Sequence, residues 1–98
     1  MIPGAISKMT EGIPIASAAT VTPRGGEVFR VTGSTQINTI NVPLGFNACQ
    51  AIYLIPTDGA LTLGTSGNII GGLTMAQNRT VMLIWLKSAQ KWYIENGA

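Results

Sequence analysis

The chain has 98 residues and a mass of 10.3 kDa, enough for one domain with a modest core but not for an added deep catalytic cleft. Only 10% of the residues are charged, against about 25% in an average soluble domain, and the net charge is +2. Because a small domain carries its charges on its surface, much of this surface must be neutral or apolar. We therefore expect a large part of it to lie against other protein.

The basic residues are scattered and form no run of the kind that binds nucleic acid or an anionic membrane. They are Lys8, Arg24, Arg30, Arg79, Lys87 and Lys91. The longest apolar run, Val81–Leu86, is far shorter than the ~20 residues of a membrane-spanning helix, and the N-terminus lacks the pattern of a signal peptide. We predict neither a nucleic-acid partner nor a membrane partner.

Cys49 is the single cysteine, so the chain can form no intrachain disulfide and no cysteine-based zinc site. A buried free thiol is the favoured interpretation, and an intermolecular disulfide or a reactive thiol is the alternative.

Residues 1–17 differ from the rest of the chain. Pro3-Gly4 and Gly12-Ile13-Pro14 interrupt regular structure, yet the segment is rich in large apolar residues, unlike a disordered tail. We interpret 1–17 as an extended N-terminal arm and 18–98 as a β domain. The arm either packs back on its own domain or reaches a neighbouring subunit, with interface residues Ile2, Ile6, Met9, Ile13 and Ile15.

From residue 18 onward the pattern predicts short strands separated by turns rich in glycine and proline. The expected strands are 18–22, 27–32, 36–42, 50–55, 60–63, 68–70, 79–86 and 91–95. In 27–32, Phe29 and Val31 alternate with residues of the opposite face, and in 36–42 Ile40 is expected opposite Ile37. Segment 50–55 is apolar on both faces and predicts a central strand, 79–86 is expected to be the longest strand, and the last two strands predict a hairpin.

This density of strands predicts an all-β fold, a compact sandwich, jelly roll or small barrel of 7–8 short strands. A short β-solenoid is the alternative, because Gly59-Ala-Leu-Thr-Leu63 resembles Gly71-Gly-Leu-Thr-Met75 and could mark stacked rungs.

The sequence offers little catalytic chemistry. It contains no histidine, which removes the commonest general base and metal ligand. The acids are Glu11, Glu27, Asp58 and Glu95, too widely spaced to predict a carboxylate pair or a calcium cage. The glycines lack the context of a phosphate-binding loop. We predict no catalytic residues, no metal site, no cofactor and no enzymatic activity.

Trp85 and Trp92 are expected to anchor the core or a subunit interface rather than to stack on bases. Among the other aromatic residues, Tyr53 and Tyr93 are candidates for holding a surface ligand such as a host sugar.

Residues 20–95 resemble small β modules of tailed-bacteriophage virion proteins. The resemblance is carried by Gly25-Gly-Glu-Val-Phe-Arg-Val-Thr-Gly33, Ile37-Asn-Thr-Ile-Asn41, Asp58-Gly-Ala-Leu-Thr-Leu63, Asn68-Ile-Ile-Gly71 and a closing Lys91-Trp-Tyr93. Copies in that family are usually domains of longer tail fibres. Because this chain starts at its own methionine, we expect a stand-alone virion component instead.

The resemblance implies a capsid decoration (cement) protein, made in the host cytoplasm and located on the capsid surface of the virion. It would bind the major capsid protein or another virion protein, stabilise the head shell and form a homotrimer. The alternative function is a tail-fibre or receptor-binding β module that holds a host surface ligand.

Overall fold

The structure, a computed structural model, describes residues 9–42 and 49–95. These residues form strands and no helix, so no helix that could span a membrane occurs among them. The strands are β1 (Ile15–Ala16), β2 (Thr20–Val21), β3 (Val28–Thr32), β4 (Thr39–Ile40), β5 (Gln50–Pro56), β6 (Leu61–Leu63), β7 (Ile69–Ile70), β8 (Leu73–Met75), β9 (Val81–Leu86) and β10 (Lys91–Glu95). The all-β class predicted from the sequence is confirmed.

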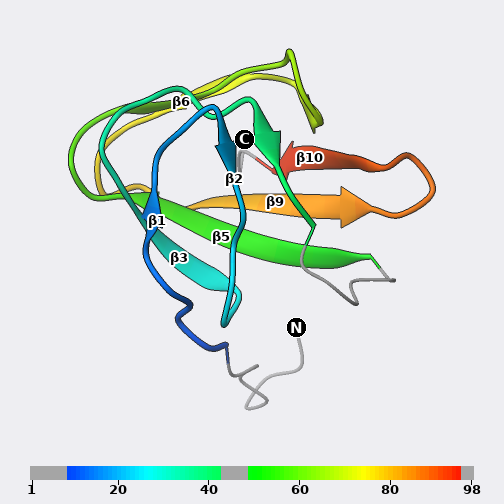
Figure 1. The fold of residues 1–98 in the computed structure, drawn as a ribbon, viewed down its shortest axis with the longest axis horizontal. Coiled ribbons are helices and arrows are strands. Elements are labelled where there is room, and N and C mark those ends of the chain that lie inside the picture. Colours follow the sequence, from blue (N-terminus) through cyan, green and yellow to red (C-terminus); the bar gives the residue numbers. More distant parts are fainter. Residues whose placement is uncertain (1–8, 43–48, 96–98) are drawn as a thin grey trace.

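A curled six-stranded sheet, half of a barrel in shape, dominates the fold (Figure 1). Its strand order is β1-β3-β5-β9-β10-β7, and two small sheets, β2-β4 and β6-β8, complete the structure. The strand predicted to be central, β5, lies between β3 and β9 in the sheet. The predicted hairpin is the antiparallel pair of β9 and β10.

The strands in the first half of the chain pair with one another in parallel. β1 pairs with β3 and β3 pairs with β5, all in parallel, while β2 pairs in parallel with β4. An isolated parallel bridge joins Ile37 to Leu63 of β6. The last part of the chain then folds back, because β8 is antiparallel to β6 and β9 is antiparallel to β5. The parallel pairing expected of a solenoid therefore occurs only among the strands up to β6.

The side chain of Asn68 links β4 to the start of β7. Its Oδ1 accepts a hydrogen bond from the backbone N–H of Ile40 at 2.9 Å, and its Nδ2 donates to the carbonyl oxygen of Ile40 at 2.8 Å. The backbone carbonyl of Asn68 in turn accepts from the N–H of Trp92 in β10. The β2-β4 pair therefore continues the curled sheet beyond β7.

The core fills the concave side of the six-stranded sheet, under the small sheets. It contains one side chain from every second position of the long strands and two buried tryptophans, Trp85 and Trp92, whose ring centroids lie 5.3 Å apart. Its members are Ile15, Val21, Phe29, Val31, Ile37, Ile40, Ile52, Leu54, Leu61, Leu63, Ile69, Met75, Val81, Leu83, Trp85 and Trp92.

Three details of the predicted strands are wrong. Ile37 and Ile40 are not on opposite faces, because both are fully buried; between them the N–H groups of Asn38 and Thr39 both donate to the Ala19 carbonyl oxygen, a bulge that breaks the alternation. The longest strand is β5 rather than β9. The two similar segments at 59–63 and 71–75 are not stacked rungs. They pair antiparallel as β6 and β8, with Thr62 opposite Thr74.

Residues 11–17 belong to the sheet rather than to a free arm. Glu11 forms a parallel bridge with Val28, Gly12 N–H donates to the Val28 carbonyl at 2.8 Å, and β1 pairs with β3. The boundary predicted after residue 17 therefore coincides with no break in the structure. Residues 1–8, the remainder of the predicted arm, lie outside the described residues.

Candidate interaction surface

Two of the four carboxylates, those of Asp58 and Glu27, accept backbone hydrogen bonds that hold neighbouring segments together. Asp58 Oδ2 accepts a hydrogen bond from the Gly33 N–H at 2.8 Å, which fastens the turn after β5 to the turn after β3. Glu27 Oε1 accepts from the Thr10 N–H at 2.9 Å and holds the segment that leads into β1. Within residues 9–42 and 49–95, histidine, cysteine, aspartate and glutamate form no group of three or more that could hold a metal ion.

The convex face of the six-stranded sheet is unusually apolar. In β3, β5, β9 and β10 alternate side chains enter the core, and the others point outward. We call these outward side chains the outer face. It comprises Val28, Arg30 and Thr32 of β3; Ala51, Tyr53 and Ile55 of β5; Met82, Ile84 and Leu86 of β9; Lys91, Tyr93 and Glu95 of β10; and Ile70 of β7.

Strand register aligns the apolar members of the outer face in two rows across the sheet. In one row Ala51 lies opposite Ile84, Ile84 opposite Tyr93, and Tyr93 opposite Ile70. In the neighbouring row Tyr53 lies between Val28 and Met82, and Met82 lies opposite Glu95. Cross-strand neighbours of this kind contact one another, so the rows form a continuous apolar surface.

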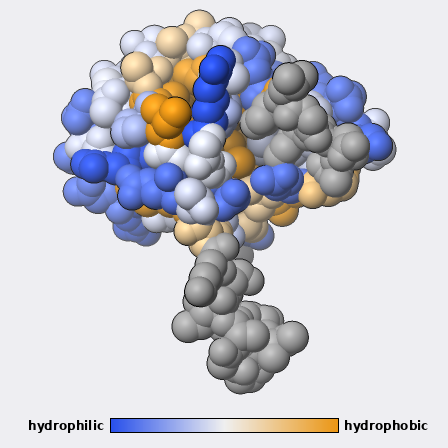
Figure 2. All heavy atoms as spheres, turned by 60° about the horizontal axis from the view of Figure 1, so that its bottom comes forward, coloured by the Kyte–Doolittle hydropathy of each residue, from blue (hydrophilic) through white to orange (hydrophobic). Residues whose placement is uncertain are grey.

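Three of the exposed large apolar members lie in the first row, since Ile70, Tyr93 and Ile84 have 43%, 39% and 37% of their surface exposed, and Leu86, outside both rows, is 38% exposed. Antiparallel strands that face water on one side normally alternate apolar-in and polar-out, and the antiparallel pair of β5 and β9 does not. Figure 2 shows one side of the molecule, where hydrophobic residues reach the surface in groups among hydrophilic ones.

Charge is confined to the borders of the outer face. Arg30 lies on β3, at one side of the apolar rows, and Glu95 lies on β10, at the other side. Lys91, also on β10, is half-buried, and its Nζ donates to the carbonyl oxygen of Gly67 at 3.4 Å. An apolar centre with a charged rim is the usual composition of a protein–protein interface.

The candidate ligand-binding tyrosines both lie on the outer face, in neighbouring rows. Tyr53 is half-buried in the central strand, and Tyr93 is exposed on β10. The tryptophans predicted to anchor the core do so: Trp92 is fully buried, and its Nε1 donates to the carbonyl of Ile40 at 3.0 Å.

The residues predicted as the interface of the arm are dispersed. Met9 is 50% exposed and Ile13 is 62% exposed, and both precede β1. Ile15 is buried in the core of its own chain, because β1 pairs with β3 and directs this side chain inward. The prediction of Ile15 as an intersubunit contact is therefore wrong. Ile2 and Ile6 lie outside the described residues.

The favoured interpretation of Cys49 as a buried thiol is also wrong, because Cys49 is exposed. It directly precedes β5, so the alternation that directs Ala51 and Tyr53 outward extends to it, and it borders the outer face. The sequence just before position 49 has no periodic pattern from which this placement could be predicted.

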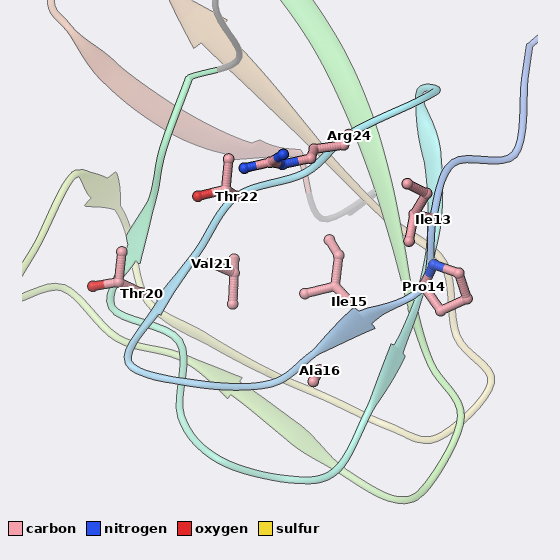
Figure 3. A pocket seen from close by; sticks show the side chains of 8 residues that line it. All are labelled: Ile13, Pro14, Ile15, Ala16, Thr20, Val21, Thr22 and Arg24. Atoms are coloured by element: carbon pink, nitrogen blue, oxygen red, sulfur yellow. The ribbon is translucent and has the colours of Figure 1, made fainter.

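A shallow hollow of about 250 Å³ lies where β1 and β2 face each other, at the open edge of the curled sheet (Figure 3). Figure 3 shows the apolar side chains of Ile15 and Val21 opposed within it and Arg24 at its rim. A second hollow of about 300 Å³ lies between β8 and β9, near Arg79. Neither hollow is lined by a carboxylate, a cysteine or a histidine.

Sequence reasoning missed the outer face as a site. The outward positions of 50–55 and 79–86 are visibly apolar, but only strand pairing shows that they adjoin Tyr93 and Ile70. Comparison with known proteins adds no assignment: no family model, no curated protein and no solved structure matches the chain.

Proposed function

We propose that this protein is a structural component of an assembly, which binds other protein through the outer face of its six-stranded sheet. The assembly that we propose is the head of a tailed phage, with the chain as a decoration protein that contacts the major capsid protein on the capsid surface. The sequence resemblance supports the phage head as the assembly, and the composition and the outer face support a structural role.

The observation that carries the proposal is the row Ala51, Ile84, Tyr93 and Ile70, in which the last three side chains are exposed and Ala51 is half-buried, on a sheet whose opposite face is already a core. Covering apolar surface contributes about 25 cal/mol per Å², so a patch of about 400 Å² would contribute about 10 kcal/mol. This is comparable to the ~4–15 kcal/mol that association costs in lost freedom. Repetition over a shell multiplies a contact of this size through avidity.

We infer no enzymatic activity and no cofactor. The sequence has no histidine to act as a general base, and Asp58 and Glu27 are each occupied by a backbone N–H. The chemistry that remains available is that of recognition.

A receptor-binding module is the second candidate function, favoured by the exposure of Tyr93 in the middle of the outer face. An aromatic ring with a hydroxyl group suits a sugar or a peptide ligand. Loss of glycan binding on Tyr93→Ala, with shell binding unchanged, would favour this function over decoration.

The proposed function is tested by binding to head shells of the particle that carries this protein. Purified chain is mixed with shells, the shells are pelleted, and the bound chain is quantified. Ile84→Lys, in the centre of the outer face, is expected to abolish binding, whereas Ser66→Lys, which adds the same charge in the exposed turn before β7, is expected to bind as the wild type does. Equal binding of both variants would contradict the proposal.

A further inference from the structure

We propose that the hollow between β1 and β2 is a second binding site, which takes the carboxyl terminus of another protein chain whose last residue is small and apolar. The carboxylate pairs with Arg24, and the last side chain lies on Ile15 and Val21. The site goes beyond the proposed function and is separate from the outer face, because β1 and β2 contribute no residue to that face.

The hollow lies between two strand edges. Among the described residues, β1 is the last strand of the six-stranded sheet, and β2 belongs to a sheet of two strands with β4. Because the Ser17 N–H donates to the Thr32 carbonyl oxygen of β3, the N–H and carbonyl of the preceding residue, Ala16, point away from β3 and toward the hollow. The backbone of β2 alternates in the same way and directs the polar groups of Thr20 away from β4. A polypeptide in the hollow can therefore form the main-chain hydrogen bonds that add a strand to a sheet edge.

Both ends of the hollow are closed, and this favours a chain end over a continuous segment. At one end the Ile13 N–H donates to the Arg24 carbonyl oxygen at 3.0 Å. At the other end residues 17–19 connect β1 directly to β2. An extended segment that lies along the strands and continues in both directions would collide with one of these closures. The last one or two residues of a chain fit between them.

Charge determines which end of a chain enters. Arg24 lies at the rim of the hollow (Figure 3), and within residues 9–42 and 49–95 no side chain is bonded to its guanidinium group. None of the side chains that line the hollow is acidic. A guanidinium group binds a carboxylate through two parallel hydrogen bonds, so it attracts a carboxyl terminus and repels an amino terminus.

The floor and the size of the hollow determine the last residue. Ile15 and Val21 are buried beneath it and oppose each other, with Pro14 and Ala16 beside them (Figure 3). The volume of about 250 Å³ is smaller than the ~300–1,000 Å³ of most ligand sites. The hollow therefore suits a small apolar residue, such as alanine or valine, together with its carboxylate.

A titration with short peptides tests the site. The probe is N-acetyl-alanyl-valine with a free carboxylate, and the comparison ligands are the same peptide as its carboxamide and sodium acetate. Amide spectra of the full chain locate the binding site and give the dissociation constant.

Two variants with matched controls separate charge from shape. Arg24→Gln removes the guanidinium group, and Arg79→Gln, at the second hollow, is its control. Ala16→Phe fills the hollow with Arg24 intact, and Ala60→Phe adds the same ring at an exposed position that does not line the hollow. Circular dichroism verifies that each variant is folded.

The expected result is that the free acid shifts the signals of residues 13–16 and 20–24, with a dissociation constant of the order of a millimolar, as is usual for a ligand of this size. The carboxamide, and the free acid with Arg24→Gln, should each bind roughly tenfold more weakly or worse, because a charge-assisted hydrogen bond is lost. Ala16→Phe should not bind, and both controls should bind as the wild type does.

Three results would overturn the proposal. The first is the absence of shifts at the hollow, and the second is a carboxamide that binds as tightly as the free acid. The third is acetate that binds as tightly as the peptide, because the hollow would then hold an anion without using its apolar floor.

The outcome is separable from that of the proposed function. Ile84→Lys leaves the hollow intact, so it should bind the peptide as the wild type does even where it no longer binds shells. Loss of peptide binding in Ile84→Lys would place the peptide on the outer face and overturn the second site.

Discussion

The amide of Asn68 binds both backbone polar groups of Ile40, accepting from its N–H at 2.9 Å and donating to its carbonyl oxygen at 2.8 Å. A side chain here takes the place of a neighbouring strand. It satisfies the free edge of β4, whose Ile40 is fully buried, and connects the β2-β4 pair with β7 and β10. A buried N–H without a partner costs about 1–3 kcal/mol, so Asn68 contributes more to the stability of the fold than an ordinary turn residue does.

Asn68→Ala is therefore expected to lower the free energy of unfolding by about 2–3 kcal/mol, because the Ile40 N–H loses its partner. Asn41→Ala is the matched control: the Asn41 side chain makes one exposed hydrogen bond, to Thr22 Oγ1, and its loss should cost less than about 0.5 kcal/mol. Urea unfolding of both variants measures the difference. Equal midpoints for the two variants would show that Asn68 does not close the sheet.

Trp92→Phe is expected to cost about 2–4 kcal/mol, because it leaves a cavity and removes the 3.0 Å hydrogen bond from Nε1 to the Ile40 carbonyl. Trp85→Phe removes the same ring atoms from the neighbouring tryptophan without touching Ile40, so a smaller loss is expected. Because Trp92 and Asn68 share the Ile40 carbonyl, the Trp92→Phe/Asn68→Ala double variant should depart from additivity by at least about 0.5 kcal/mol. Strictly additive values would contradict a shared carbonyl.

Gly26→Ala is expected to detach the segment before β1. A Cβ at Gly26 would overlap the Thr10 carbonyl oxygen and the Gly12 nitrogen, both backbone atoms that cannot turn away. At Gly71, where φ is +95° and nothing lies within 4 Å of an added Cβ, Gly71→Ala strains only the local backbone, at about 1–2 kcal/mol, and displaces no neighbouring segment. Limited proteolysis followed by mass spectrometry should show new cleavage near residues 10–13 in Gly26→Ala alone. An intact segment in that variant would mean that it is not held by this close approach.

Cys49 is expected to react with a thiol reagent in the native protein, because it is exposed beside the outer face. Labelling of dilute protein should reach one thiol per chain without denaturant. A thiol that reacts only after urea is added would contradict the placement of Cys49.

Local patterns predicted much of the sheet. Alternation placed Phe29 and Val31 together on one face of β3, which the structure shows to be the core face, and apolarity on both faces identified 50–55 as central. The last two strands formed the expected hairpin because only a short turn separates them. In each case the pattern and the structure that it specifies lie within a few residues of each other.

The features that local patterns missed depend on distant partners. β1 was assigned to an arm because Pro14 and Gly12 interrupt its pattern, and only pairing with β3 makes it a strand. Asn68 resembles an ordinary turn residue until Ile40 is placed beside it. The similarity of 59–63 to 71–75 specified which segments are alike but not their direction, which the antiparallel pairing of β6 and β8 decides.

The central claim is that the outer face is a surface that other protein covers, and amide spectra of the chain recorded while the major capsid protein is added test it most directly. The account predicts shifts and line broadening on addition of that protein that are confined to β3, β5, β9, β10 and β7, centred on Ile84 and Tyr93, and absent from β6 and β8. Spectra that do not change, or changes centred on β6 and β8, would contradict it.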